Sequence, residues 1–155
     1  MNVAAFADLL FEEREALKAL MCLLNDEQVL LRGTRVDELS GLTEKKVGIL
    51  VRLGELASSR HRTLAAQGYA PDEKGMHGWL DQHPTAGFNQ VWTEIRTMIP
   101  LAREQNRLNG LLIAKRLSRN QQALGLLRGE PLPAMIYGSD GQLKIASVMR
   151  SPVVS

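Results

Sequence analysis

Cysteine is nearly absent from this sequence, and so are the residue patterns that usually mark a metal or catalytic site. The single cysteine, Cys22, excludes an intramolecular disulfide and is typical of a reducing compartment. It lies between Leu20 and Leu24, so we expect it to be a small core residue. The sequence contains no glycine-rich phosphate loop, no paired cysteines and no Glu-x-x-His pairs, and no nucleophile–base–orienter set can be named. We therefore expect no metal, no cofactor and no enzymatic activity.

Long apolar runs and clusters of basic residues are also missing. No uncharged apolar stretch reaches the roughly 18 residues that a membrane helix needs, and no signal segment begins the chain. The formal net charge is only +2, without a Lys/Arg run or aromatic residues interleaved with basic ones, which argues against a nucleic-acid partner. We expect a soluble cytoplasmic protein that neither binds nucleic acid nor inserts stably into a membrane.

The residues that are present favour long helices. Apolar residues make up 45% of the 155 positions and aromatic residues only 5%, so leucine and alanine must supply most of the core. Residues 3–31 contain no glycine or proline, and Glu13 and Glu27 fill positions within their apolar seam. The spacing of three, four and seven predicts one amphipathic helix with coiled-coil-like packing. Its expected core positions are Phe6, Leu10, Leu17, Leu20, Leu24 and Leu31.

Three further helices follow in the pattern. Residues 36–67 predict a second long helix, which the short connection should fold back antiparallel to the first. Its expected apolar stripe is Leu39, Leu42, Val47, Leu50, Leu53, Leu56 or Ala57, and Leu64. Residues 72–83 predict a short helix anchored by Trp79 and Leu80. Residues 85–128 predict a third long helix that continues through Pro100 with a kink.

The expected fold is therefore all-α. We predict an antiparallel bundle of three long helices with coiled-coil-like packing, one short connecting helix and an irregular C-terminal tail. Residues 1–130 should form the helical bundle domain. Residues 131–155, which are interrupted by proline and glycine, should form a flexible or loosely docked tail, with residues 137–143 as a turn between two short extended pieces.

Two features of this pattern could carry binding. Asn106 and Asn109 lie on one face of the third long helix. Asparagine is a poor helix former, so two asparagines in a helix interior need an explanation. They either fix the register of the bundle internally or contact a partner directly. Met135, Ile136 and Tyr137, with Leu132 nearby, form an apolar cluster that either folds back on the bundle or orders when a partner binds.

Several motifs together resemble the FlgN-type flagellar export chaperones. They are a leucine-rich, glutamate-containing first helix, Leu-Thr-Glu-Lys-Lys at 42–46, Arg-His-Arg-Thr-Leu at 60–64, Asn-x-x-Asn-Gly followed by Leu-Leu-Ile at 106–113, and Tyr-Gly-x-x-Gly at 137–141. The Asn-x-x-Asn-Gly segment is the more specific of these. The resemblance extends over most of the chain in the order of its elements.

The resemblance implies a chaperone without enzymatic activity for hook-associated proteins of the FlgK and FlgL type at the hook–filament junction. Such a chaperone binds the client's helical C-terminal segment, prevents premature assembly and delivers the client to the flagellar type III export apparatus. We expect the client along the third long helix after Pro100 and against the tail. The expected client-binding residues are Asn106, Asn109, Leu112, Ile113, Leu117, Leu124, Ile136 and Tyr137. By resemblance, Tyr137 is also an expected contact for the export gate.

Two other classes of protein would fit the same pattern. A self-assembling structural coiled-coil protein would use the apolar stripes for homo-oligomerisation instead of client binding. A helical-bundle enzyme or phosphotransfer module would need an exposed histidine on a bundle helix, for which His61 is the only candidate.

Overall fold

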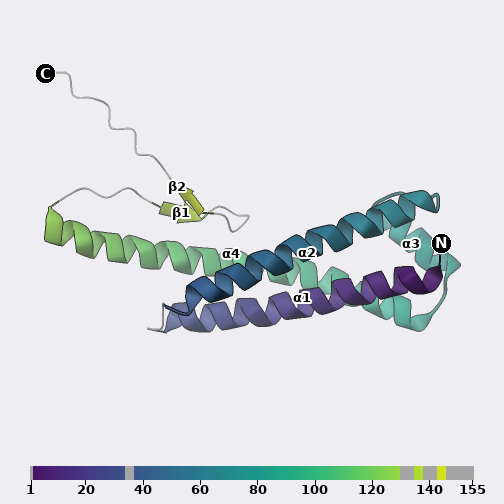
Figure 1. Ribbon diagram of the computed structural model, residues 1–155, viewed down its shortest axis with the longest axis horizontal. Helices are drawn as coiled ribbons and strands as arrows, with labels where there is room; N and C mark the ends of the chain where they lie inside the picture. The colour runs from purple at the N-terminus through teal and green to yellow at the C-terminus, as the bar shows by residue number, and fades with distance from the viewer. Residues whose placement is uncertain (1, 34–36, 130–134, 138–142, 146–155) are drawn as a thin grey trace, which may run out of the picture.

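The chain folds into an elongated bundle in the computed structural model, which describes residues 2–33, 37–129, 135–137 and 143–145. The described elements are α1 (Val3–Arg32), α2 (Leu39–Ala66), α3 (Glu73–Gln82), α4 (Ala86–Arg128), β1 (Met135–Tyr137) and β2 (Leu143–Ile145). Figure 1 shows the three long helices running along the long axis, with α3 near the N-terminal end of α1. The predicted all-α bundle of three long helices and one short helix is confirmed.

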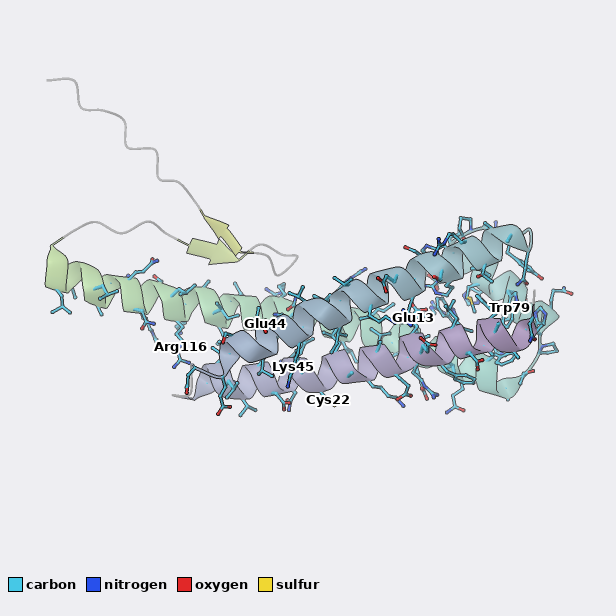
Figure 2. The ribbon with its side chains drawn as sticks, in the orientation of Figure 1. Glu13, Cys22, Glu44, Lys45, Trp79 and Arg116 are labelled. Carbon is cyan, nitrogen blue, oxygen red and sulfur yellow. The ribbon has the colours of Figure 1, made fainter. Side chains whose placement is uncertain are left out.

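α1 is the central helix, because both α2 and α4 pack against it. The side chain of Asn2 caps its first turn by accepting a hydrogen bond from the amide of Ala4 at 3.0 Å. All six predicted core positions of this helix are buried, and so are Glu13 and Glu27 within the same seam. The prediction for Cys22 was wrong, because this side chain is exposed on the outer face of α1 (Figure 2).

α2 lies antiparallel to α1 (Figure 1), but it buries fewer apolar side chains than its pattern predicts. Leu56 and Leu64 are buried as expected, whereas Val47 and Leu50 are 54% and 44% exposed. The periodicity identified apolar faces correctly but could not tell which of them another helix covers. The face of α2 toward α1 instead buries Lys46 and Arg60.

A cluster of aromatic side chains closes the bundle at the α3 end. Trp79 is fully buried, with the Phe6 ring edge-on at 4.5 Å and the His83 ring stacked at 4.3 Å between centroids. Asp72 caps α3 by accepting a hydrogen bond from the amide of Gly75 at 2.8 Å. A Cβ atom at Gly75 would overlap the backbone of Ala70. Glycine is therefore required where this turn closes.

α4 is the longest helix and continues past Pro100 without ending. Near the C-terminal end of α1, Arg116 donates hydrogen bonds to the carbonyls of Leu30 and Leu31 at 3.4 and 3.1 Å. Arg116 thus places a cation at the C-terminal end of α1, where the Leu30 carbonyl also accepts a hydrogen bond from the Gly33 amide at 3.2 Å. Beyond Arg116, α4 extends past the ends of α1 and α2 (Figure 2).

The short strands β1 and β2 pair antiparallel, with Met135 opposite Ile145 and Tyr137 opposite Leu143. β1 lies beside α4. The rest of the predicted tail lies outside the described residues, so the division into domains 1–130 and 131–155 remains a prediction. None of the described helices is long and apolar enough to cross a membrane.

Candidate functional site

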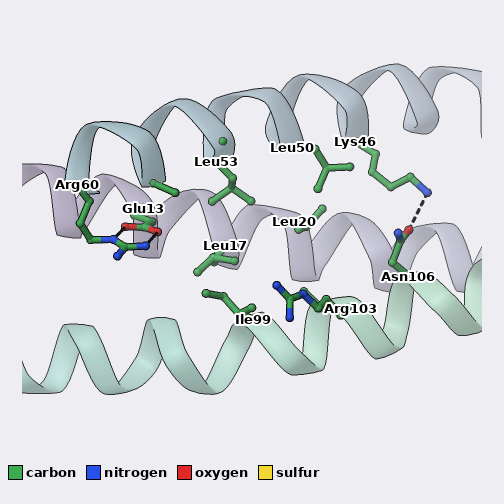
Figure 3. Close-up of a pocket in the computed structure, with 13 residues that line it drawn as sticks. Glu13, Leu17, Leu20, Lys46, Leu50, Leu53, Arg60, Ile99, Arg103 and Asn106 are labelled. Carbon is green, nitrogen blue, oxygen red and sulfur yellow. Dashed lines mark hydrogen bonds and ion pairs between the residues drawn. The ribbon is translucent and has the colours of Figure 1, made fainter. Parts of the chain in front are cut away.

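A groove runs between α2 and α4, with α1 as its floor (Figure 3). Its volume is about 680 Å³. Leu17 and Leu20 form an apolar floor, while Leu50, Leu53 and Ile99 contribute apolar side chains to the two walls. The groove exists because α2 and α4 each pack on α1 and leave a gap between themselves. It is a place where an additional helix could complete the bundle.

The Glu13–Arg60 ion pair lies at one end of this groove, and Lys46, which belongs to a second ion pair, lies at the other end (Figure 3). At one end, Arg60 donates from Nε and Nη2 to the two carboxylate oxygens of Glu13, at 2.9 and 3.2 Å. The Arg60 guanidinium also lies 4.8 Å from the ring centroid of Trp92. At the other end, Lys46 Nζ donates to Glu27 at 3.0 and 3.2 Å. All four charged side chains are buried, so each charge depends on its partner.

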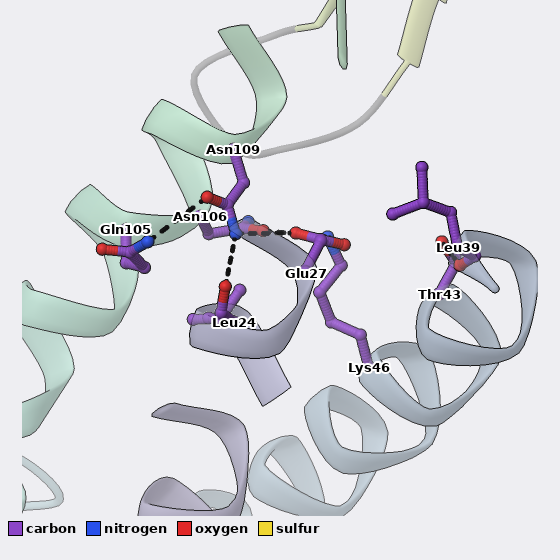
Figure 4. Close-up of polar contacts among 8 residues, drawn as sticks. All are labelled: Leu24, Glu27, Leu39, Thr43, Lys46, Gln105, Asn106 and Asn109. Carbon is purple, nitrogen blue, oxygen red and sulfur yellow. Dashed lines mark hydrogen bonds and ion pairs between the residues drawn. The ribbon is translucent and has the colours of Figure 1, made fainter. Parts of the chain in front are cut away.

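The two asparagines of the Asn-x-x-Asn-Gly motif join the second ion pair (Figure 4). Asn109 is fully buried and donates from Nδ2 to the Leu24 carbonyl at 2.8 Å and to Glu27 Oε1 at 2.9 Å. Asn106 is partly buried and accepts a hydrogen bond from Lys46 at 3.1 Å. The network therefore links α1, α2 and α4. In the free chain both amides contact the bundle, and a direct client contact by Asn109 would require α4 to separate from α1.

Three of the four remaining predicted contact residues on α4, Ile113, Leu117 and Leu124, lie on one face, whereas Leu112 lies about 100° or more from each of them around the helix. Leu112, Ile113 and Leu117 are half-buried, and Leu124 is 47% exposed. Ile113 follows Asn106, and Leu117 and Leu124 follow Arg103, at intervals of seven residues. Because such an interval drifts by only about 20° around a straight helix, the groove wall of α4 continues along the helix into these positions. We call this continuous surface the α4 stripe.

Two predicted site residues cannot be placed in the same detail. The backbones of Ile136 and Tyr137 lie in β1, which runs beside α4. Their side chains lie outside what the structure describes, so their contacts with a client or an export gate stay predictions.

Sequence reasoning missed the charged residues of the groove. Arg103 lines it, is exposed, and forms no ion pair with any described residue. Lys46 and Arg60 were not singled out because single charged residues in a helix usually face solvent. A signal was nevertheless present: Lys46 and Arg60 are fourteen residues apart, as are the seam residues Glu13 and Glu27.

Other charged groups near the groove are ordinary surface pairs. On α4, Arg107 donates to Glu104 at 2.7 and 2.9 Å, and this hydrogen bond lowers the pKa of the exposed Glu104 carboxyl. Across the described ranges, no three His, Cys, Asp or Glu side chains gather closely enough to hold a metal ion. Among the described residues, the groove therefore presents apolar surface, the unpaired cation of Arg103 and side chains of two buried ion pairs.

Known proteins are similar to this chain over nearly its whole length. The family model described as "FlgN protein" matches residues 1–145. Flagella synthesis protein FlgN of Yersinia enterocolitica is 30% identical over 140 residues, covering 89% of this chain and 88% of the relative. The protein of that name in Salmonella typhimurium is 27% identical over 142 residues, covering 90% and 91%. The one in Escherichia coli is 28% identical over 138 residues, covering 88% of each. No solved structure is a significant match.

Proposed function

Because this chain belongs to the FlgN family, we propose that it is a cytoplasmic export chaperone for hook-associated proteins of the FlgK and FlgL type. It binds the helical C-terminal segment of the client, prevents its premature assembly and delivers it to the flagellar type III export apparatus. The relatives carry the name flagella synthesis protein, which supports a role in building the flagellum.

The observation that carries this proposal is the apolar α4 stripe, which the described part of the chain covers only partly. Half-buried Ile113 and Leu117 lead to the exposed Leu124 on the part of α4 that extends past the α1–α2 hairpin (Figure 1). A client helix with apolar residues at i, i+3, i+4 and i+7 can cover such a stripe. Each Å² of apolar surface buried contributes about 25 cal/mol, less the cost of ordering the client. Capture therefore needs no nucleotide or cofactor.

Two leucines on α4 provide a direct test of the stripe. Leu124 lies on it, whereas Leu126 is 87% exposed and lies off it, at 200° from Leu124 around the helix. The C-terminal segment of a FlgK-type protein is titrated calorimetrically into the wild type, Leu124→Ser and Leu126→Ser. We expect about a threefold to tenfold loss of affinity for Leu124→Ser, since one leucine contact is removed, and little change for Leu126→Ser. Equal affinities would contradict the stripe.

The tail is tested separately. Truncation after Arg128 should weaken binding in the same titration if β1 and its neighbours contribute to the client site, and unchanged affinity would remove the tail from it. If Tyr137 also contacts the export apparatus, Tyr137→Ala should lower secretion of hook-associated proteins by more than its loss of client affinity in the titration explains. Normal secretion by this variant would contradict that role.

Light scattering distinguishes client binding from self-assembly. A chaperone should form a complex of defined mass when the client segment is added. A stable homo-oligomer whose mass does not change with client would instead favour a structural coiled-coil protein. Co-purification from a flagellated cell, with the bound proteins identified by mass, then names the preferred client.

A further inference from the structure

The groove between α2 and α4 has a defined length. Its end pairs, Glu13–Arg60 and Glu27–Lys46, are fourteen residues apart on α1 and fourteen residues apart on α2. At 1.5 Å per residue this distance is about 21 Å, or about four turns of an α-helix. Figure 3 shows Glu13–Arg60 at one end of the groove and Lys46–Asn106 at the other, with the apolar side chains between them.

We propose that this groove holds one amphipathic helix of the client, about four turns long, which places a carboxylate beside Arg103. The inference rests on the proposed chaperone function and specifies the chemistry of its client. The bound helix presents apolar side chains to the floor at Leu17 and Leu20 and to the walls at Leu50, Leu53 and Ile99. The client helix would become the fourth helix of the bundle and would contact α1, α2 and α4.

The α2 wall leaves room for a helix to approach. Gly54 and Ala57 are the small residues of this wall, and a Cβ atom built at Gly54 would meet nothing within 4 Å. Helices pack at 8–10 Å between axes only where the contacting side chains permit it. No part of the described chain uses the space at Gly54, so the space is available to an incoming helix.

Charge complementarity identifies the polar part of the occupant. Glu13 neutralises Arg60, and Glu27 neutralises Lys46, so the positive charges at the groove ends are already compensated. Arg103 lies between these ends and has no ion-pair partner among the described residues. A carboxylate on the client helix would supply that partner and fix the direction and register of the helix. An apolar helix with a basic residue at this position would be disfavoured by repulsion.

Two matched pairs of substitutions test the groove in the full-length chain. Gly54→Trp fills it, whereas Gly48→Trp places the same side chain elsewhere on α2, where a Cβ atom also meets nothing within 4 Å. Arg103→Glu reverses the free charge, whereas Arg119→Glu makes the same change on an exposed site about 160° around α4. Circular dichroism melting establishes that each variant folds, and calorimetry measures its affinity for the C-terminal segment of a FlgK-type protein.

We expect Gly54→Trp to lower affinity by about tenfold or more and Arg103→Glu by about threefold to tenfold. Gly48→Trp and Arg119→Glu should bind like the wild type. Replacing the responsible client carboxylate with lysine should restore binding to Arg103→Glu. If the wild type binds the segment and all four variants bind equally well, the groove assignment is overturned while the chaperone function stands. If the wild type binds no hook-associated segment, both proposals fail.

A photo-crosslinking residue at position 50 identifies the occupant directly, because Leu50 lines the groove and is 44% exposed. With client present, we expect the cross-linked product to contain the client helix. Cross-links found solely to residues 130–155 of the same chain, or solely to a second copy, would overturn the assignment of the groove to the client.

Discussion

Arg60 binds both carboxylate oxygens of Glu13, at 2.9 and 3.2 Å, inside the seam between α1 and α2. This pair lies two heptads from the pair formed by Glu27 and Lys46, so the two helices are joined at matching positions of one antiparallel register. A shift of α2 along α1 would separate both pairs and leave four charges buried. We therefore expect the ion pairs to fix the alignment of the helices more than they add to stability.

Replacing one member of the Glu13–Arg60 pair should destabilise the fold strongly. We expect Arg60→Met to lower the free energy of unfolding by about 3–5 kcal/mol, because Glu13 would remain buried without a partner. The double variant Glu13→Leu/Arg60→Met should fall within about 1 kcal/mol of the wild type or exceed it. Urea unfolding followed by circular dichroism measures both. If the double variant is as unstable as Arg60→Met, the unpaired charge of Glu13 is not what destabilises Arg60→Met.

Asn109 should matter for stability far more than an exposed asparagine on the same helix. Asn109→Ala removes the hydrogen bonds to the Leu24 carbonyl and to Glu27, which should cost about 1–3 kcal/mol. Asn120 is exposed, so Asn120→Ala should change the free energy of unfolding by no more than about 0.5 kcal/mol. Both variants replace asparagine with alanine within α4, so they gain the same helix propensity, and the difference between them reports the lost hydrogen bonds. Similar stabilities for the two variants would contradict the internal role of Asn109.

Gly75 and Gly48 should respond to alanine in opposite directions. A Cβ atom at Gly75 would overlap the Ala70 backbone, so Gly75→Ala should destabilise the α3 end by about 2–3 kcal/mol. At Gly48 a Cβ atom has open space, and Gly48→Ala should stabilise α2 by about 0.5–1 kcal/mol. Thermal unfolding measures the stability change in each variant. A stabilised Gly75→Ala would mean that the turn before α3 is packed differently.

The Glu104 carboxyl offers a test of the α4 surface by titration. Its hydrogen bond from Arg107 lowers its pKa below the ordinary value of 4.5. The pair therefore contributes to stability above that ordinary value, and the contribution is lost as the pH falls through the lowered pKa. Arg107→Ala should raise the Glu104 pKa toward 4.5 in a carbon-detected NMR titration, whereas Arg119→Ala should leave it unchanged. An unchanged pKa in Arg107→Ala would show that the hydrogen bond is absent in solution.

The helices and the core of α1 were predictable because their apolar spacing is regular and uninterrupted. The uncovered faces were not, since Leu50 carries the same periodic signal as a buried leucine and differs only in having no helix opposite. Cys22 was misplaced for a related reason: its neighbours Leu23 and Leu24 are buried, but it lies on the other side of the helix. Burial of Lys46 and Arg60 depends on partners elsewhere in the chain, which only the matched spacing with Glu13 and Glu27 could reveal.

The part of α4 beyond Arg116 has a consequence for local stability. About twelve residues of helix extend past the α1–α2 hairpin, and a helix of that length is marginal in water without packing. Its amide hydrogens should therefore exchange with solvent through local fraying, while those around Trp79 exchange only when the whole bundle unfolds. Helix formation in this extension would then be coupled to occupancy of the α4 stripe. We therefore expect the aromatic end of the bundle to resist exchange and the far end of α4 to become protected when a client helix packs on it.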